Sequence, residues 1–157
     1  MEFLHTKLHL AHRGIKLNNI LLHNGYCKIT DFSFAKTCWD AMGDAPIMTN
    51  TIVGTEPYFS PQLVEKNQYN AFANDVWACG VALFAITNNR YPFHAGKAEL
   101  MLIEQKSSTF IHTRFIKRFS QDYTALLLQH FAYEENARIT MPDVLKSQWI
   151  TRLVKTK

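Results

Sequence analysis

The sequence predicts a mainly α-helical fold with one small β-hairpin near its amino-terminal end. Asn24 and Gly25 separate the β-prone runs NILLH and YCKIT, and both residue types tolerate the positive φ angles of a two-residue hairpin turn. The second half of the chain contains one continuously apolar segment and three amphipathic segments at helical spacing. The expected architecture is therefore a helical bundle that carries a hairpin, with strands near 20–23 and 26–30.

The composition indicates a single packed domain with no nucleic-acid or membrane partner. The 157 residues are 47% hydrophobic, which is enough apolar material for a sizeable core. Lysine and arginine are scattered, and no basic and aromatic residues alternate in the manner of a nucleic-acid platform. Three widely spaced cysteines fit neither a disulfide framework nor a metal site, and no signal peptide is visible. We therefore expect an intracellular protein, cytoplasmic or nuclear.

The first seventy residues predict a helix end, the hairpin and a long loop. Residues 2–11 have apolar side chains at helical spacing but no amino-terminal cap, which suggests that upstream sequence is missing or was never present. The strands of the hairpin follow. Residues 31–70 contain Pro46, Pro57 and Pro61 and show no sustained periodicity, which predicts a long loop of the kind often kept for function.

The remaining segments predict helices. The run VWACGVALFAI at 76–86 is too short to span a bilayer and predicts a helix buried on all sides, capped by Asn74 or Asp75 and closed near Asn88 and Asn89. Amphipathic helices are expected near 97–106, 121–132 and 141–150. For the last of these, Thr140 is the predicted cap and Pro142 lies in the first turn.

Five motifs occur in an informative order: HRGIKLNN, DFS, GTEPYFSPQ, DVWACG and ARITMPDVLKSQWI. Together they resemble the carboxy-terminal lobe (C-lobe) of a eukaryotic protein kinase of the serine/threonine type, and YPF at 91–93 resembles the calmodulin-dependent and checkpoint kinases. The resemblance implies a partial kinase domain over residues 1–157, from the end of the helix before the catalytic loop to the last helix. Residues 31–62 then form an activation-segment-like loop.

The resemblance implies a site for Mg²⁺ and ATP. Asp31 matches the main metal-binding aspartate and Asn19 the second metal ligand, and Leu21 joins both in contacting the cofactor. Lys16 matches the lysine that contacts the γ-phosphate, and Thr55 matches the threonine that supports this lysine.

Three positions depart from the family pattern. Gly14 occupies the position of the catalytic aspartate that accepts the substrate proton, a contribution typically worth ~10² to 10⁴ in rate. Ser33 replaces the glycine of the usual Asp-Phe-Gly triplet. Gln62 replaces an acid whose family partner is the arginine matched by Arg138, so we expect the activation segment to be docked less firmly.

Structural roles are implied for several other matched residues. His12 and Phe32 resemble members of an internal hydrophobic spine, and Asp75 is expected to accept backbone hydrogen bonds from the catalytic loop. Thr49 and Thr51 lie where activation-loop phosphorylation sites fall. Arg13 could pair with a phosphate there.

No amino-terminal lobe (N-lobe) can be placed on this sequence. The six glycines never approach G-x-G-x-x-G spacing, so an apolar surface that this lobe covers in the family should be exposed. Such a surface predicts a protein partner, poor solubility or a longer native protein. The leading hypothesis is a catalytically impaired pseudokinase that acts by binding. The alternative is a fragment of an ATP-dependent serine/threonine kinase whose N-lobe is missing from this chain. A third possibility is a truncated product that does not fold stably.

Overall fold

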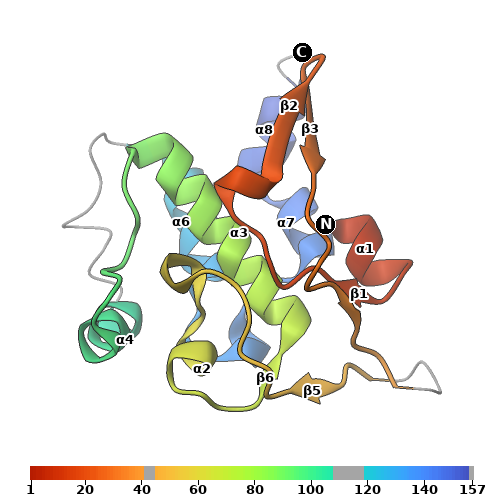
Figure 1. Cartoon of the computed structure of the whole chain (residues 1–157). Coiled ribbons are helices and arrows are strands. Elements are labelled where there is room, and N and C mark those ends of the chain that lie inside the picture. Colours follow the sequence, from red (N-terminus) through yellow and green to blue (C-terminus); the bar gives the residue numbers. More distant parts are fainter. Residues whose placement is uncertain (41–44, 108–118, 156–157) are drawn as a thin grey trace.

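The chain folds into a helical body that carries small two-stranded sheets. The computed structural model describes residues 1–40, 45–107 and 119–155 (Figure 1). The α-helices are α1 (Glu2–Thr6), α2 (Pro61–Val64), α3 (Ala71–Asn88), α4 (Ala98–Ser107), α6 (Gln121–His130), α7 (Met141–Lys146) and α8 (Gln148–Lys155). Short 3₁₀ helices are η1 (Leu17–Asn19), η2 (Glu56–Tyr58) and η3 (Glu135–Ala137). The strands are β1 (Leu10–Ala11), β2 (Ile20–His23), β3 (Tyr26–Ile29), β4 (Lys36–Thr37), β5 (Met48–Thr49) and β6 (Tyr69–Asn70).

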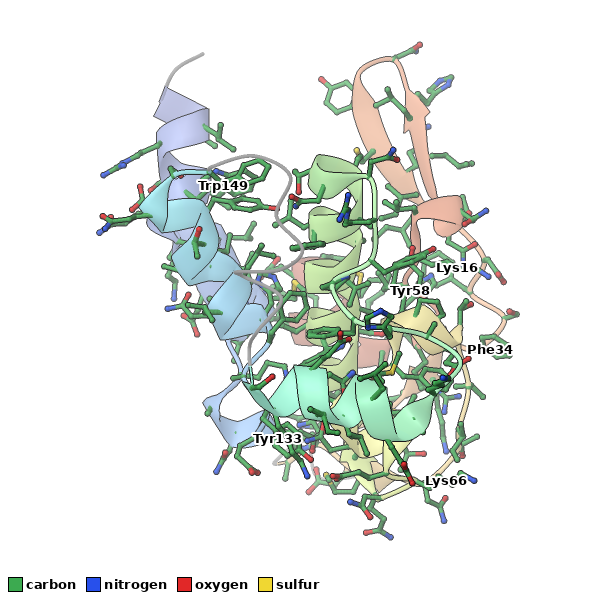
Figure 2. The ribbon with its side chains drawn as sticks, turned by 90° about the vertical axis from the view of Figure 1, so that its left-hand side faces the viewer. Lys16, Phe34, Tyr58, Lys66, Tyr133 and Trp149 are labelled. Atoms are coloured by element: carbon green, nitrogen blue, oxygen red, sulfur yellow. The ribbon has the colours of Figure 1, made fainter. Side chains whose placement is uncertain are left out.

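The predicted hairpin is confirmed. Strands β2 and β3 are antiparallel, and His23 pairs with Tyr26 across the turn. Asn24 and Gly25 have φ angles of 50° and 77°, the left-handed values that a two-residue turn of this kind requires. The hairpin extends away from the helices in both Figure 1 and Figure 2. Six of its eight strand residues are exposed, and the other two, Ile20 and Ile29, are half-buried.

Helix α3 runs through the centre of the body and is longer than predicted. It begins at Ala71 because the side chain of Asn70 accepts hydrogen bonds from the backbone N–H groups of Phe72 and Ala73. The predicted cap at Asn74 or Asp75 is therefore wrong, and both residues are buried inside the helix. The helix ends at a left-handed Asn89, as predicted, but it is not buried on all sides, since Ile86 is 70% exposed.

The main core lies between α3 and the elements packed on it. The indole of Trp77 stacks on Phe93 with ring centroids 5.4 Å apart and meets Phe131 edge-on at 5.1 Å. Helix α6 approaches α3 closely at Gly80, where an added Cβ would lie 2.6 Å from the Cβ of His130. The absence of a side chain at Gly80 is thus a packing requirement of the α3–α6 contact.

Other boundaries differ from the predictions for local reasons. The helix predicted over 2–11 stops at Thr6, because His9 takes a left-handed φ of 49° and residues 10–11 pair with β4. The helix predicted over 141–150 is two helices, which separate at the extended Ser147. Thr140 does occupy the N-cap position of α7, but its hydroxyl donates to the Asp143 carboxylate instead of accepting from the backbone.

The long loop predicted over 31–70 contains regular structure. Strand β5 pairs with β6, and η2 and α2 lie between them, while residues 41–44 are outside the described part of the chain. These strands are two residues long, which is too short to give a detectable alternation in the sequence. The helices predicted near 97–106 and 121–132 correspond to α4 and α6 within two residues at each boundary.

We predict that Gly80→Ala destabilises the fold. The new Cβ would contact the backbone-linked Cβ of His130, so α3 and α6 would have to separate. Overpacking of this kind typically costs about 1–3 kcal/mol in the free energy of unfolding, measured by urea denaturation. Ile86→Ala, on the exposed side of the same helix, is the matched control and should change stability by less than about 0.5 kcal/mol. A Gly80→Ala protein as stable as the wild type would contradict this account of the α3–α6 contact.

Candidate functional site

A buried carboxylate in α3 holds the loop of residues 12–19, hereafter the 12–19 loop. Asp75 is fully buried, and its two oxygens accept the backbone N–H groups of His12 at 2.6 Å and Arg13 at 2.8 Å. His5 Nε2 lies 3.1 Å from Asp75 Oδ2, and the ring nitrogen is the donor because an ionised carboxylate only accepts. The hydrogen bonds expected of Asp75 are therefore present. They fix the start of the loop against the central helix.

Gly14 is held in this loop through its backbone. Its N–H donates to His12 Nδ1 at 3.2 Å, and its carbonyl accepts from Asn19 Nδ2 at 2.9 Å. The atoms nearest to a Cβ added at Gly14 belong to His12 and Phe34, at 3.5 Å and 3.6 Å, which are ordinary contact distances. Its φ also lies outside the left-handed region. Neither packing nor backbone conformation therefore requires glycine at this position.

The hairpin brings Asn19 beside Asp31. The register of β2 on β3 continues beyond Ile20, so that Thr30 N–H donates to the Asn19 carbonyl at 2.9 Å. Asn19 is buried, and its Nδ2 lies 3.4 Å from Asp31 Oδ2. Because this nitrogen also serves the Gly14 carbonyl, the amide oxygen of Asn19 is the group left for a ligand. The turn type thus determines the meeting of an amide and a carboxylate that are twelve positions apart in the sequence.

Asp31 carries a stabilised negative charge. It is exposed, and the hydroxyl of Ser33 donates to its Oδ1 at 2.6 Å. This hydrogen bond, followed by the backbone N–H of Ser33, lowers the pKa of Asp31 below its ordinary value, and Asn19 and Lys16 act in the same direction. Asp31 is therefore ionised at neutral pH and can serve as an oxygen ligand.

Lys16 connects the 12–19 loop to the segment of η2. Its Nζ lies 3.4 Å from Thr55 Oγ1, and the backbone N–H of Leu17 donates to Tyr58 Oη at 3.2 Å. Lys16 and Tyr58 lie close together in Figure 2, with Phe34 on the same side of the body. Burial raises the pKa of Tyr58 to about 12, so its hydroxyl stays protonated while it accepts this bond. Hydrogen bonds therefore link Lys16 to Thr55. Asn19 links the Gly14 carbonyl to the Asp31 carboxylate.

The other predicted residues lie around this place. His12 and Phe32 are in contact, with ring centroids 4.8 Å apart, although Phe32 is 43% exposed. Leu21 follows Asn19 on β2 and is 52% exposed. Thr49 is buried and accepts the N–H of Thr51 on its hydroxyl at 3.3 Å.

Arg13 adopts a left-handed φ of 59°. Its Nε donates to the Phe34 carbonyl at 2.7 Å. This bond joins the 12–19 loop to the segment that follows Asp31.

Gln62 and Arg138 form the predicted pair without a second charge. Arg138 is buried, and its Nη2 donates to Gln62 Oε1 at 3.1 Å. Three carbonyls, of Ala73, Ala132 and Tyr133, also accept from this guanidinium, and it lies over the Trp77 ring. Burial lowers the pKa of Arg138 to about 10, against the opposing effect of Glu135 and Glu134, so it remains charged at neutral pH. Arg138 therefore keeps a hydrogen bond to Gln62 in the activation-segment-like loop, which we expected to be docked less firmly.

Two residues of the site escaped sequence reasoning. His5 contacts Asp75 from seventy positions away, and no local pattern signals such a contact. Ser33 was noted only as a substitution, but its hydroxyl makes the shortest hydrogen bond to Asp31.

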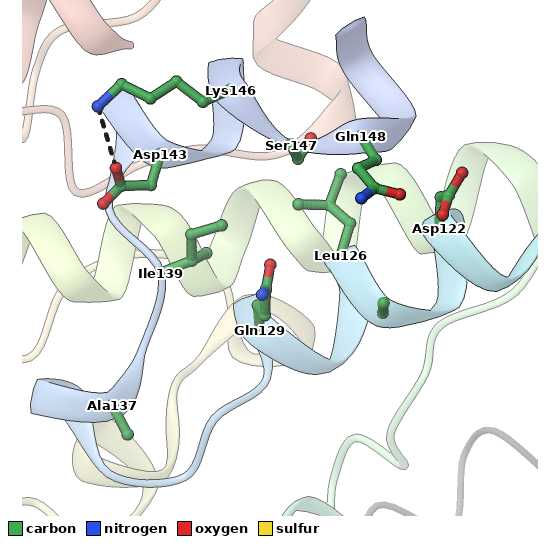
Figure 3. Close-up of a pocket in the computed structure, with 10 residues that line it drawn as sticks. Asp122, Leu126, Gln129, Ala137, Ile139, Asp143, Lys146, Ser147 and Gln148 are labelled. Carbon is green, nitrogen blue, oxygen red and sulfur yellow. Dashed lines mark hydrogen bonds and ion pairs between the residues drawn. The ribbon is translucent and has the colours of Figure 1, made fainter. Parts of the chain in front are cut away.

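One cavity of the described chain lies away from these residues, and a smaller one is lined by Gly14, Thr55 and Tyr58. The larger one, of about 630 Å³, opens between α6, α7 and α8, where Lys146 pairs with Asp143 at 3.3 Å (Figure 3). Gln129 and Gln148 also line it, and none of the site residues named above does. Within the described residues, no helix is both long and apolar enough to cross a membrane.

The donor set of the site suits a hard divalent cation. A carboxylate and an amide oxygen are ligands that Mg²⁺ prefers, and Mg²⁺ usually completes its shell with water and substrate phosphates. Among the residues that the structure describes, no group of three or more His, Cys, Asp or Glu side chains could hold a metal by itself. Asp31 and Asn19 therefore fit a cation that arrives with a phosphate ligand.

Comparisons with known proteins agree with the motifs. A family profile described as "Protein kinase domain" matches residues 1–150. CBL-interacting protein kinase 12 of Oryza sativa subsp. japonica is 29% identical over 153 residues, which cover 97% of this chain and 27% of that protein. CBL-interacting serine/threonine-protein kinase 18 of Arabidopsis thaliana is 30% identical over 90% of this chain and 26% of that protein. Serine/threonine-protein kinase SRK2B of Arabidopsis thaliana is 29% identical over 92% of this chain and 40% of that protein. The chain thus spans between a quarter and two fifths of these relatives.

We predict that Asp75→Asn loosens the 12–19 loop. The carboxylate of Asp75 now accepts hydrogen bonds from three donors. In the Asp75→Asn variant an NH₂ group replaces one carboxylate oxygen, so at least one of these donors would face another donor. The expected loss is about 1–3 kcal/mol in the free energy of unfolding, with faster amide hydrogen exchange at His12 and Arg13. Asp143→Asn, on the exposed start of α7, is the matched control and should leave both quantities nearly unchanged. Unaltered exchange in Asp75→Asn would show that the loop is held by other contacts.

Proposed function

The chain belongs to the protein kinase domain family, and from this premise we propose that it is a catalytically impaired serine/threonine-kinase-like protein that acts by binding. The observation that carries the proposal is Gly14. A glycine offers no group to accept a substrate proton, and the hydrogen bonds around it are complete without one. An added Cβ would meet His12 and Phe34 at ordinary contact distances, so the space next to the backbone does not by itself call for glycine.

The remaining groups support a weak, residual contact with Mg²⁺ and ATP. Asp31 and Asn19 would hold the cation, which when bound neutralises phosphate charge and orients the nucleotide. Lys16, kept beside Thr55, would face the terminal phosphate. With no carboxylate at Gly14, this arrangement positions phosphates but lacks a base for the acceptor hydroxyl.

The partner that we propose is a protein lobe that packs on the hairpin side. Leu22 is 75% exposed and Tyr26 is 74% exposed, and Leu21 adds a third apolar side chain on the same hairpin. In this register Leu21 and Tyr26 lie on one face of the hairpin and Leu22 lies on the other, so both faces expose apolar side chains that a partner could cover. Because the curated relatives are more than twice as long as this chain, the proposed occupant is an N-lobe, from the same polypeptide or from another chain.

The second candidate is a fragment of an ATP-dependent serine/threonine kinase. It is favoured by the same length difference and by the retained metal-ligand pair of Asp31 and Asn19. The size of the native polypeptide separates the two candidates. Blotting with an antibody against residues 67–75 should give a species near 18.1 kDa for a stand-alone lobe. A species longer by roughly 100 residues, on the order of one small domain, would favour the fragment.

We predict that Gly14→Asp increases phosphoryl transfer once an N-lobe is present. The chain would be joined to the N-lobe of one of the plant relatives and assayed with Mg²⁺, ATP and a generic protein substrate. A carboxylate at this position should raise the rate by ~10² to 10⁴ over the same fusion with Gly14. Gly14→Ala and Gly14→Asn test the effect of a side chain without a base, and both should stay at the unmodified rate.

Two results would contradict the proposal. Transfer by the isolated wild-type chain would show that Gly14 does not mark lost catalysis. Equal rates for Gly14→Asp and Gly14→Asn, both above the unmodified fusion, would assign the gain to loop rigidity instead of to a proton acceptor.

A further inference from the structure

The hydroxyl of Ser33 donates a hydrogen bond to the carboxylate of Asp31, the group that would bind a cation. Ser33 Oγ lies 2.6 Å from Asp31 Oδ1, which is within the range of a strong hydrogen bond from a hydroxyl to a charged oxygen. Both residues are exposed and only two positions apart, so the contact is local and needs no support from the core. A glycine at position 33 could not make it.

Both oxygens of Asp31 receive protein donors. Asn19 Nδ2 lies 3.4 Å from Oδ2, and the backbone N–H of Ser33 lies 3.4 Å from Oδ1, on the same oxygen as the hydroxyl. Hydrogen-bond donors and metal ions compete for the same lone pairs of a carboxylate. A cation that approaches Oδ1 must therefore displace the hydroxyl proton or share the oxygen with it.

We infer that Ser33 is a positioning residue that caps Asp31 and weakens the binding of a divalent cation at this site. The inference rests on the proposed function, in which Asp31 and Asn19 hold the metal. It adds a second defect to the site, independent of Gly14: one substitution removes the proton acceptor, and the other reduces the availability of a ligand.

A hydroxyl next to a metal ligand can also assist binding by orienting the ligand. Here the orientation has other sources. The backbone N–H of Ser33 and the amide of Asn19 each direct one oxygen of Asp31, and neither depends on the side chain of Ser33. Removing the hydroxyl thus frees a lone pair and leaves two of the three donors in place.

The test is a titration of the whole chain with Mn²⁺ alone, in which free Mn²⁺ is followed by electron paramagnetic resonance. Ser33→Ala should bind Mn²⁺ about 3-fold to 10-fold more tightly than the wild type, the range expected when an exposed hydrogen bond to a charged group is lost. Ser33→Gly should behave in the same way. Ser33→Thr keeps the hydroxyl and should retain the wild-type affinity.

Two controls identify the site and exclude a general effect. Asp31→Asn should abolish the tighter binding when combined with Ser33→Ala. Thr37→Ala removes an exposed hydroxyl from the nearby strand β4 and should change nothing. Thermal melting by circular dichroism should be the same for all variants, since Ser33 and Asp31 are exposed.

Three outcomes would overturn the inference. Equal or weaker Mn²⁺ binding by Ser33→Ala would assign the hydroxyl an orienting role or none. Absence of binding by Ser33→Ala at millimolar Mn²⁺ would show that capping does not limit the site. Binding that is insensitive to Asp31→Asn would place the cation elsewhere and would also remove the metal from the proposed function. The first outcome leaves that function intact, so the two failures are distinguishable.

Discussion

The arrangement of the site depends on one buried charge, the carboxylate of Asp75. A buried carboxylate is costly unless each oxygen is hydrogen-bonded, and Asp75 meets this condition with the N–H groups of His12 and Arg13 and the ring of His5. These donors come from segments more than sixty residues away, so the central helix and the 12–19 loop satisfy each other. Arg13, held in a left-handed conformation, then directs the chain toward Gly14 and Lys16.

The hydrogen bonds that hold the 12–19 loop do not involve a side chain at position 14. Every hydrogen bond that places Gly14 is made by its backbone, so the loop keeps its path whether or not residue 14 has a carboxylate. The amide nitrogen of Asn19 likewise serves a backbone carbonyl, that of Gly14. The proposed loss of a proton acceptor is therefore compatible with the path that the 12–19 loop takes in this structure.

The sequence predicted the parts of the molecule that local signals determine. The hairpin followed from Asn24 and Gly25, and the central helix from its apolar run, because turn type and burial are encoded within a few residues. The cap of that helix was misplaced because Asp75, a good cap residue, instead serves partners distant in sequence. The 141–150 helix was predicted unbroken because serine at 147 is not by itself a strong terminator. The candidate site residues came from the resemblance, whereas the contacts of His5 and Ser33 required three-dimensional geometry.

Ser33 and Gln62 show a common principle in the departures of this chain from its family. Each is a neutral polar residue that hydrogen-bonds a charged partner, Ser33 to Asp31 and Gln62 to Arg138. At Arg138 three backbone carbonyls and an aromatic face contact the buried cation, and the charges of Glu134 and Glu135 favour it from nearby. At Asp31 the hydroxyl likewise stabilises an anion that has no fixed cation in contact. Both substitutions therefore leave a charged group of the folded chain with a neutral hydrogen-bond partner.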